Sequence, residues 1–266
     1  MLLLKDLYKT FNCGSINEKT AINGLSLDMN PGDFVCVIGG NGAGKSTLLN
    51  VIAGVFPVDM GQIIIDGTSV ESQPEYVRAA SIGRVFQDPM MGTAASMTIE
   101  ENLAMALKRG SRRRLRRGIR RRDQAYFREQ LSLLGLGLED RLSTRVGLLS
   151  GGQRQALTLL MATLVPPKLL LLDEHIASLD PGTAEKVLEL TERIINKHKL
   201  TTLMVTHNME DALNMGNRTI MMHEGQIILD LDDKQRQNIS IVDLLDMFEK
   251  ASGVSIANDR MLLANY

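Results

Sequence analysis

Tryptophan is absent from this 266-residue sequence, and aromatic residues make up only 4% of it. Because 44% of the residues are hydrophobic, the core must be mainly aliphatic, as in α/β proteins with buried parallel strands. No apolar run approaches the length that crosses a membrane, and no basic-then-apolar leader opens the sequence. We therefore expect a chain that meets a membrane only through a partner.

Cysteine is scarce as well, and two residues cannot make a disulfide framework. Cys36 lies inside the apolar run 34–38 and is expected to be a small core residue. A reducing, cytoplasmic setting is consistent with this cysteine usage.

Charge is unevenly distributed, although the net value is only −1. Ten Lys or Arg and no acid lie between residues 108 and 122, so the rest of the chain holds 20 basic and 31 acidic residues, about −11 formally. This run is either a solvated face or a contact for an anionic partner. Nucleic acid is not the expected partner, because no aromatic residues that could stack on bases interleave the arginines.

Apolar periodicity predicts an α/β core with a helical section inserted at about residues 88–162. Thr98 and Glu101 form a predicted capping box within that section. The expected strands cover residues 2–8, 24–29, 34–38, 61–67, 169–172, 202–205, 219–222 and 226–229, the last two as a hairpin-like pair. The expected helices cover residues 45–53, 124–136, 181–197 and 239–248.

A phosphate-binding loop is predicted at residues 39–46, which satisfy G-x-x-x-x-G-K-S between an expected strand and an expected helix. Glycines let backbone N–H groups turn toward phosphates, and the helix N-terminus favours an anion. Lys45 would reach the β- and γ-phosphates, Ser46 would place its hydroxyl on Mg²⁺, and Thr47 would add a donor. An ordinary glycine-rich turn is the weaker interpretation in this context. The predicted ATP-binding residues of the loop are Gly39, Asn41, Gly42, Ala43, Gly44, Lys45, Ser46 and Thr47.

Two carboxylates follow the apolar run 169–172. Asp173 would serve Mg²⁺, and Glu174, which points away from it, would polarise an attacking water. An acidic strand end would be the better interpretation in isolation, but not beside a phosphate loop.

A second phosphate-binding surface is indicated by Leu-Ser-Gly-Gly-Gln at residues 149–153. One compact domain has no evident use for two such surfaces on one nucleotide. The simplest resolution is that two chains share each ATP.

Together these motifs resemble the nucleotide-binding subunit of an ATP-binding cassette (ABC) transporter over about residues 1–230. The resemblance implies a P-loop NTPase fold with a RecA-like core, an antiparallel β subdomain and the inserted helical subdomain. It divides the chain into an ABC ATPase domain at residues 1–232 and a short helical tail at 233–266. Residues 39–47 match Walker A, 169–174 match Walker B with its adjoining base, and 149–153 match the family signature.

Further positions take their roles from the resemblance. Gln87 matches the Q-loop, which senses Mg²⁺ and the γ-phosphate, Asp180 ends the D-loop, and His207 is the switch histidine. Phe11 falls where the family stacks an aromatic on adenine, with Tyr8 as an alternative. The expected catalytic residues are Lys45, Gln87, Glu174 and His207. The expected metal ligands are Ser46, Gln87 and Asp173. The other three histidines are expected to be structural.

By resemblance, two copies sandwich two ATP molecules head to tail. Each ATP lies between one chain's Walker A and the signature of the other, and the expected signature contacts are Ser150, Gly151, Gly152 and Gln153. The implied partners are transmembrane permease subunits and an extracytoplasmic substrate-binding lipoprotein, with this chain on the cytoplasmic face of the membrane. The basic run from Arg112 to Arg122 would contact acidic cytoplasmic loops or anionic lipid.

An importer is the favoured function, because residues 92–104 and 174–181 look most like bacterial ATPases encoded with a lipoprotein binding subunit. Such systems have been linked to amino acids, including aromatic ones. A lipid-directed or mechanotransmitting exporter ATPase is the alternative. A non-transport ABC ATPase acting on DNA or ribosomes is disfavoured, because the chain has one cassette and no long heptad run. A P-loop kinase or GTPase is disfavoured still more, because neither class of protein needs the Leu-Ser-Gly-Gly-Gln run at residues 149–153.

Overall fold

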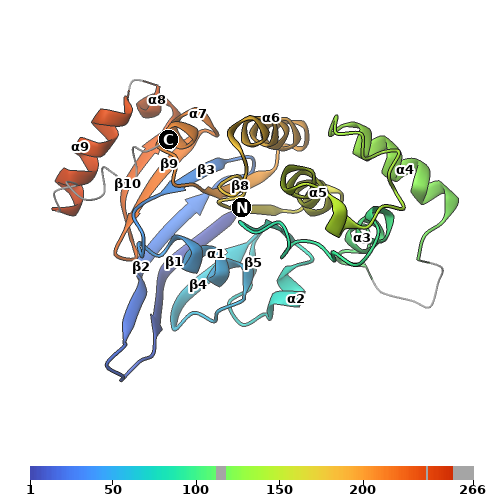
Figure 1. Ribbon diagram of the computed structural model, residues 1–266. Coiled ribbons are helices and arrows are strands. Elements are labelled where there is room, and N and C mark those ends of the chain that lie inside the picture. Colours follow the sequence, from blue (N-terminus) through green and yellow to red (C-terminus); the bar gives the residue numbers. More distant parts are fainter. Residues whose placement is uncertain (112–117, 238, 254–266) are drawn as a thin grey trace. The chain divides into compact units, whose positions relative to one another are not determined.

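The computed structural model describes residues 1–111, 118–237 and 239–253, which fold as two compact units (Figure 1). The first unit comprises residues 1–78 and the described residues from 201 onward, and the second comprises residues 79–200. Among the described residues, no helix is both long and apolar enough to cross a membrane. The predicted limits of the ATPase domain, its helical subdomain and the tail remain predictions.

An antiparallel sheet forms one part of the first unit, with its strands in the order β2-β1-β4-β5. These strands are β1 (Leu2–Phe11), β2 (Lys19–Met29), β4 (Met60–Ile65) and β5 (Thr68–Ser69). Leu4 pairs with Leu27 on one side and with Ile63 on the other, and all three side chains are buried. Strands β1 and β2 extend beyond their predicted limits, because their pairing continues out to Phe11 and Lys19.

Parallel strands form the other part of the first unit, where β3 lies between β8 and β9 and runs parallel to both. β10 pairs antiparallel with β9, as the predicted hairpin requires. The strands are β3 (Phe34–Ile38), β8 (Thr201–Val205), β9 (Arg218–His223) and β10 (Gln226–Asp232). Every residue of β3 and β8 is buried, so a continuous apolar run is what their positions demand.

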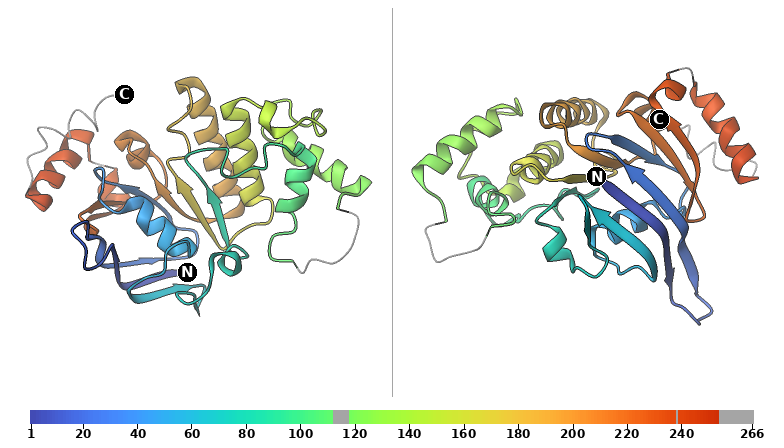
Figure 2. Two further views of the ribbon diagram at one scale, coloured as in Figure 1. Left: turned by 60° about the horizontal axis from the view of Figure 1, so that its bottom comes forward. Right: turned by 180° about the vertical axis from the view of Figure 1, so that it is seen from behind.

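Five helices of the first unit join or follow these strands. They are α1 (Lys45–Ala53), α2 (Glu75–Arg78), α7 (Met209–Asn214), α8 (Asp233–Arg236) and α9 (Ile241–Ser252). α9 begins after a capping box of Ser240 with Asp243 and ends at Gly253, so the helix lies slightly later than the predicted 239–248. Both views in Figure 2 show it beside the β9–β10 hairpin.

The second unit combines two parallel strands with helices. The strands are β6 (Ile82–Val85) and β7 (Leu169–Asp173). The helices are α3 (Ile99–Ala106), α4 (Arg121–Ser132), α5 (Gly151–Thr163) and α6 (Pro181–His198), with a 3₁₀ turn η1 (Val146–Leu148). α3, α4 and α5 share an aliphatic core around the fully buried Phe127. A core of this kind agrees with the low aromatic content of the sequence.

Local signals set the ends of the helical elements. The predicted capping box at α3 is confirmed, since the Glu101 N–H donates to Thr98 Oγ1 over 3.3 Å and the Thr98 N–H donates to Glu101 Oε2 over 2.7 Å. The helix predicted at 124–136 was placed too late and is α4. It ends at Ser132, three residues before Gly135, which has a left-handed φ of 66°.

Three arginines cover the carboxyl ends of helices, where backbone carbonyls lack partners within the helix. Arg78 donates to the carbonyls of Val51 and Ile52 at the end of α1. Arg236 donates to the carbonyls of Ala212, Leu213 and Met215 at the end of α7. Both arginines are buried, and burial lowers the pKa of Arg78. The positive charge at each of these ends also complements the helix dipole.

The third such arginine, Arg109, changes the interpretation of the basic run. Its guanidinium donates to the carbonyls of Ala162 and Val165 at the end of α5, and burial lowers its pKa. Arg109 is therefore a structural residue and does not belong to a basic surface. Residues 112–117 lie outside the described residues, whereas Arg120, Arg121 and Arg122 are exposed.

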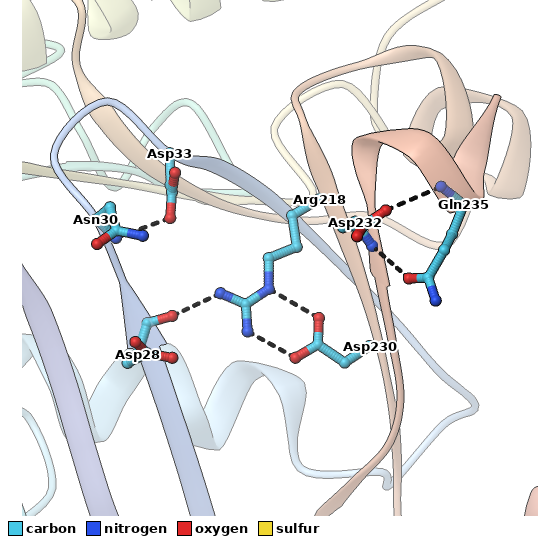
Figure 3. A network of polar contacts seen from close by, with 7 residues as sticks. All are labelled: Asp28, Asn30, Asp33, Arg218, Asp230, Asp232 and Gln235. Atoms are coloured by element: carbon cyan, nitrogen blue, oxygen red, sulfur yellow. Dashed lines mark hydrogen bonds and ion pairs between the residues drawn. The ribbon is translucent and has the colours of Figure 1, made fainter.

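A polar network joins the strands of the first unit around Arg218, as Figure 3 shows. Arg218 binds both carboxylate oxygens of Asp230, at 2.7 and 2.6 Å, and donates to the carbonyl of Asp28 over 2.6 Å. The hydrogen bond with Asp230 is the main reason why the pKa of Arg218 is raised. The bidentate contact holds β10 to β9. The hydrogen bond to Asp28 on β2 ties the β9–β10 hairpin to the antiparallel sheet.

Helices α5 and α6 approach closely where α5 begins. A Cβ on Gly152 would collide with Cγ2 of Thr183 on α6. A Cβ on Gly151 would instead make an ordinary contact, 3.6 Å from Leu179 Cδ2. Of these two glycines, only Gly152 has to lack a side chain if the helices are to pack in this way.

We predict that Gly152→Ala lowers the free energy of unfolding by about 1–3 kcal/mol, because overpacking pushes α5 away from α6. Chemical denaturation followed by far-UV circular dichroism measures this loss. Gly151→Ala is the matched control and should change stability by no more than about 0.5 kcal/mol. Adding Thr183→Ser, which removes Cγ2, should restore most of the stability lost in Gly152→Ala. Equal losses in both single variants would contradict this account.

Candidate functional site

The predicted phosphate loop leaves the sheet after β3 and leads into α1, in a conformation that requires glycine. Gly39 and Gly44 have φ values of 149° and 101°. A Cβ at these positions would collide with the carbonyl oxygens of Met222 and Ala21, respectively. The loop is thus pressed between the β9–β10 hairpin and β2, and only glycine permits that approach.

Lys45 folds back over the loop that it follows. It is only 7% exposed, and its Nζ donates to the carbonyls of Gly39, over 2.7 Å, and Gly40, over 3.1 Å. Three other residues of the loop and of the helix start are exposed to solvent: Asn41, Gly42 and Ser46. The loop therefore presents a buried ammonium group, exposed backbone and the start of a nine-residue helix, which together suit a polyphosphate.

Backbone hydrogen bonds support the loop from behind. The N–H of Gly225, in the β9–β10 turn, donates to the carbonyl of Ala43 over 3.0 Å, and the carbonyl of Gly225 accepts from Asn23 over 3.0 Å. The predicted site did not include Gly225. The sequence predicts a hairpin turn at residues 223–225. It does not predict that this turn contacts the phosphate loop, which lies much earlier in the chain.

The predicted switch histidine follows β8 at the same sheet edge as the phosphate loop. β8 is parallel to β3 with Val205 opposite Val37, so His207 and Gly39 leave the carboxyl ends of adjacent strands. Asn208 then caps α7 by accepting from the N–H groups of Glu210 and Asp211. The first unit thus brings His207 and the phosphate loop to one edge.

Asp211 adds a charge next to His207 that the sequence analysis did not identify. Burial raises the pKa of this carboxyl, the charge of Glu210 raises it further, and the charge of His207 lowers it. The Asp211 carboxyl and the His207 imidazole are therefore electrostatic neighbours across the first turn of α7.

Phe11 and Tyr8, the two candidates for stacking on adenine, differ in their surroundings. Phe11 ends β1 opposite Lys19, whose Nζ lies 3.3 Å from the place a Cβ of Gly42 would occupy. The hydroxyl of Tyr8 lies 3.0 Å from the corresponding place at Gly24, within the antiparallel sheet. Phe11 is therefore the aromatic residue whose strand neighbour reaches the phosphate loop.

In the second unit, the predicted metal and base carboxylates share a sheet edge with Gln87. β6 and β7 are parallel with Val85 opposite Leu172, so the segments that follow them emerge together. Arg84 Nη2 lies 3.5 Å from Asp173 Oδ2. Glu174 has a left-handed φ of 42° and begins a tight turn in which its carbonyl accepts from Ala177. Positive φ at a residue other than glycine is uncommon, and such strained positions cluster at functional sites.

The backbone around Gln87 is held by two side chains from neighbouring elements. Ser178 Oγ donates to the carbonyl of Gln87 over 3.4 Å, and Gln155 Nε2 donates to the carbonyl of Phe86 over 3.1 Å. Gln155 is fully buried on α5 and was not predicted, because a glutamine inside a helix carries no distinctive pattern.

The signature run forms the start of α5. Ser150 Oγ accepts from the Gln153 N–H over 3.2 Å, and Gln153 Oε1 accepts from the Ser150 N–H over 3.2 Å, which makes a capping box. Ser150 and Gly151 are exposed, and Gly152 is buried. The predicted D-loop residue Asp180 caps α6 by accepting from the Thr183 N–H over 3.1 Å, and its hydrogen bonds with Thr183 lower the pKa of the carboxyl.

The other buried ionisable side chains have structural surroundings. His175 is fully buried with Nε2 3.1 Å from Thr191 Oγ1, and burial lowers its pKa to about 4. Burial also raises the pKa of the Cys36 thiol to about 12, so this cysteine is an inert core residue.

Comparison with known proteins identifies the family. A family model described as ABC transporter matches residues 22–177. The chain is 45% identical over 251 residues to a tyrosine transport ATP-binding protein of Clostridioides difficile (strain R20291), covering 94% of this chain and 100% of the relative. It is 35% identical over 211 residues to an aliphatic sulfonates import ATP-binding protein of Agrobacterium fabrum, covering 79% and 73% of the two chains.

Solved structures agree with this assignment. A dimeric ATP-binding cassette in a post-hydrolysis state, bound to ADP and Pi, aligns with a TM-score of 0.75 at 26% identity, covering 88% of this chain and 99% of that chain. The family match includes the phosphate loop of the first unit and both carboxylates of the second. The chain therefore belongs to the ABC transporter family: it is the ATP-binding, ATP-hydrolysing subunit of such a transporter.

Proposed function

We propose that two copies of this chain close head to tail on two ATP molecules, so that the phosphate loop of one copy and the signature run of the other hold each nucleotide. The main support is the way in which α5 begins. Gly152 is packed against α6 of its own chain, whereas Ser150 and Gly151 are exposed at the positive end of the helix. That end can accept an anion carried by a second molecule.

Within each site we assign the phosphates to the loop and to Lys45, and the adenine to Phe11. Ser46, Gln87 and Asp173 would hold Mg²⁺, which when bound would neutralise phosphate charge. A small set of oxygen ligands fits this ion, because Mg²⁺ usually keeps phosphate oxygens and waters in its coordination shell. Nucleotide and ion would bind together, because the phosphates would supply part of the coordination shell of the ion.

Glu174 would accept a proton from the attacking water, and His207 would contact the γ-phosphate. Asp180 and Gln153 would complete the contact between the two copies. The γ-phosphate bridges an interface that ADP cannot complete, so ATP would close the dimer and hydrolysis would reopen it.

We predict that Glu174→Gln lowers the ATPase rate about 100-fold or more, because removal of a general base typically costs that much. The same variant should become a stable dimer with ATP but not with ADP, which sedimentation-velocity measurements would detect. Adding Ser150→Arg to Glu174→Gln is the matched control and should leave a monomer, because it blocks the signature surface. A Glu174→Gln monomer with unchanged turnover would contradict the shared site.

The transport role that we propose is import of an aromatic amino acid such as tyrosine. It rests on the 45% identity, over its full length, to a protein described as a tyrosine transport ATP-binding protein. In this proposal the chain works at the cytoplasmic face of the membrane with permease subunits and an extracytoplasmic substrate-binding lipoprotein. ATP-driven closure of the dimer would drive the permease through its transport cycle.

We predict that cells lacking this chain lose most of their high-affinity uptake of radiolabelled tyrosine, and that the wild-type chain restores it. The Glu174→Gln chain should not restore it, because it cannot reopen after ATP binding. Sulfate uptake in the same cells serves as the specificity control and should be unchanged. Normal tyrosine uptake without the chain would refute this substrate, and tyrosine efflux that depends on the chain would indicate an exporter.

We further propose that the basic run contacts anionic lipid head groups. Arg120, Arg121 and Arg122 are exposed at the start of α4, where Asp123 Oδ1 lies 3.7 Å from Arg122 Nε. Basic residues near an anionic membrane surface each contribute about 1 kcal/mol of attraction.

Replacing these three arginines with glutamine should weaken binding to phosphatidylserine-containing vesicles by about tenfold or more at low salt, as measured by co-sedimentation. Neutral phosphatidylcholine vesicles should not distinguish the variant from the wild type. Glutamine at Lys9, Lys19 and Lys234 is a control of equal charge change elsewhere on the chain. An equal loss in both triple variants would show that net charge, and not this run, governs the interaction.

A further inference from the structure

The C-terminal helix α9 is amphipathic and buries one face. Leu244, Leu245 and Phe248 are at most 7% exposed, whereas Val242 is 62% exposed on the other side. The helix packs beside β10, and its capping box and terminal glycine define both of its ends. Figure 2 shows the same position in both views. α9 is therefore a fixed part of the first unit.

The last large apolar side chain of this face reaches the end of β9. The ring of Phe248 meets the imidazole of His223 edge to face, with centroids 5.5 Å apart and an interplanar angle of 86°. Aromatic pairs in this geometry attract beyond their buried area. His223 is half-buried and immediately precedes the turn of the β9–β10 hairpin.

That turn is the support of the phosphate loop. Met222, next to His223, places its carbonyl where a side chain on Gly39 would lie, and its methyl group 3.4 Å from the Cβ position of Gly44. Gly225 donates to the carbonyl of Ala43 over 3.0 Å. Its own Cβ position lies 2.9 Å from the carbonyl oxygen of Ala21 on β2. Hairpin, loop and β2 thus meet through backbone atoms, so the turn cannot shift without moving the loop.

We propose that α9 sets the affinity of the phosphate loop for ATP, with Phe248 and His223 as positioning residues that press the hairpin turn onto residues 39–44. Neither side chain touches the nucleotide. The inference rests on the proposed binding of ATP phosphates at this loop. It assigns the C-terminal helix a role in nucleotide binding that lies outside the motifs of the sequence.

Two features explain why the effect should appear in binding and not in turnover. Glu174, the proposed base, belongs to the second unit, whereas Phe248 and His223 belong to the first. The loop's N–H groups must all point at the phosphates when ATP binds, and a looser loop has to be ordered at that moment. The ordering cost then appears as weaker affinity.

The test is the equilibrium binding of mant-ATP, a fluorescent ATP, to the full chain, together with the KM and kcat of ATP hydrolysis. Phe248→Ala should raise the Kd and KM roughly tenfold, with kcat at saturating ATP within about twofold of the wild type. His223→Ala, at a half-buried position that tolerates truncation better than a core site, should shift Kd in the same direction. It keeps the test decisive if Phe248→Ala does not fold.

Leu244→Ala is the matched control, since it removes a fully buried side chain from the same helix, one turn before Phe248. It should lower the melting temperature yet leave Kd unchanged. Equal rises in Kd for Leu244→Ala and Phe248→Ala would overturn the proposal, as would an unchanged Kd in a folded His223→Ala. Lys45→Ala tests the loop itself: if it leaves Kd unchanged, the assigned phosphate site is wrong, whatever the α9 variants do.

Discussion

The close backbone approach at the phosphate loop is the constraint on which the first unit depends. Three chain segments meet where a side chain on Gly44 or on Gly225 would collide with the backbone carbonyl of Ala21. The carbonyl of the buried Ala43 and the N–H of Asn23 on β2 are both paired with Gly225, so hydrogen bonds join the three segments at this junction. An anion site built in this way is rigid before its ligand arrives, which reduces the entropy lost on binding.

At the helix ends, too, backbone groups that lack partners within the helix are paired with side chains. Capping boxes open α3, α5, α8 and α9, and arginine side chains cover the carboxyl ends of α1, α5 and α7. Ser150 and Gln153 belong to this structural pattern and also to the proposed nucleotide contact. Ser150 and Gln153 hydrogen-bond to each other within the single chain. An incoming γ-phosphate would therefore meet a helix start that is already ordered. At the start of α5, Gly152 packs on α6, whereas Ser150 and Gly151 are exposed.

Much of the architecture could be predicted because it depends on local pattern. The buried strands β3 and β7, the hairpin of β9 and β10 and the capping box at Thr98 each follow from a few adjacent residues. The family was recognisable for the same reason, since each of its motifs is a short contiguous run. Helix α4 was placed too late because its limit depends on Gly135 and on burial against α3 and α5, which apolar periodicity does not encode.

The supporting residues were hidden from the sequence because their roles arise from contacts between distant segments. Arg109 looked like part of a basic run, yet it covers the end of a helix more than fifty residues away. Gln155 and Gly225 carry no motif, and only folding brings them to Gln87 and the phosphate loop. The sequence by itself determined the family and predicted the residues proposed to bind ATP, because that chemistry requires particular side chains at fixed spacing. Tertiary structure alone decided what holds those residues in place, because packing depends on shape and distance between elements and not on order along the chain.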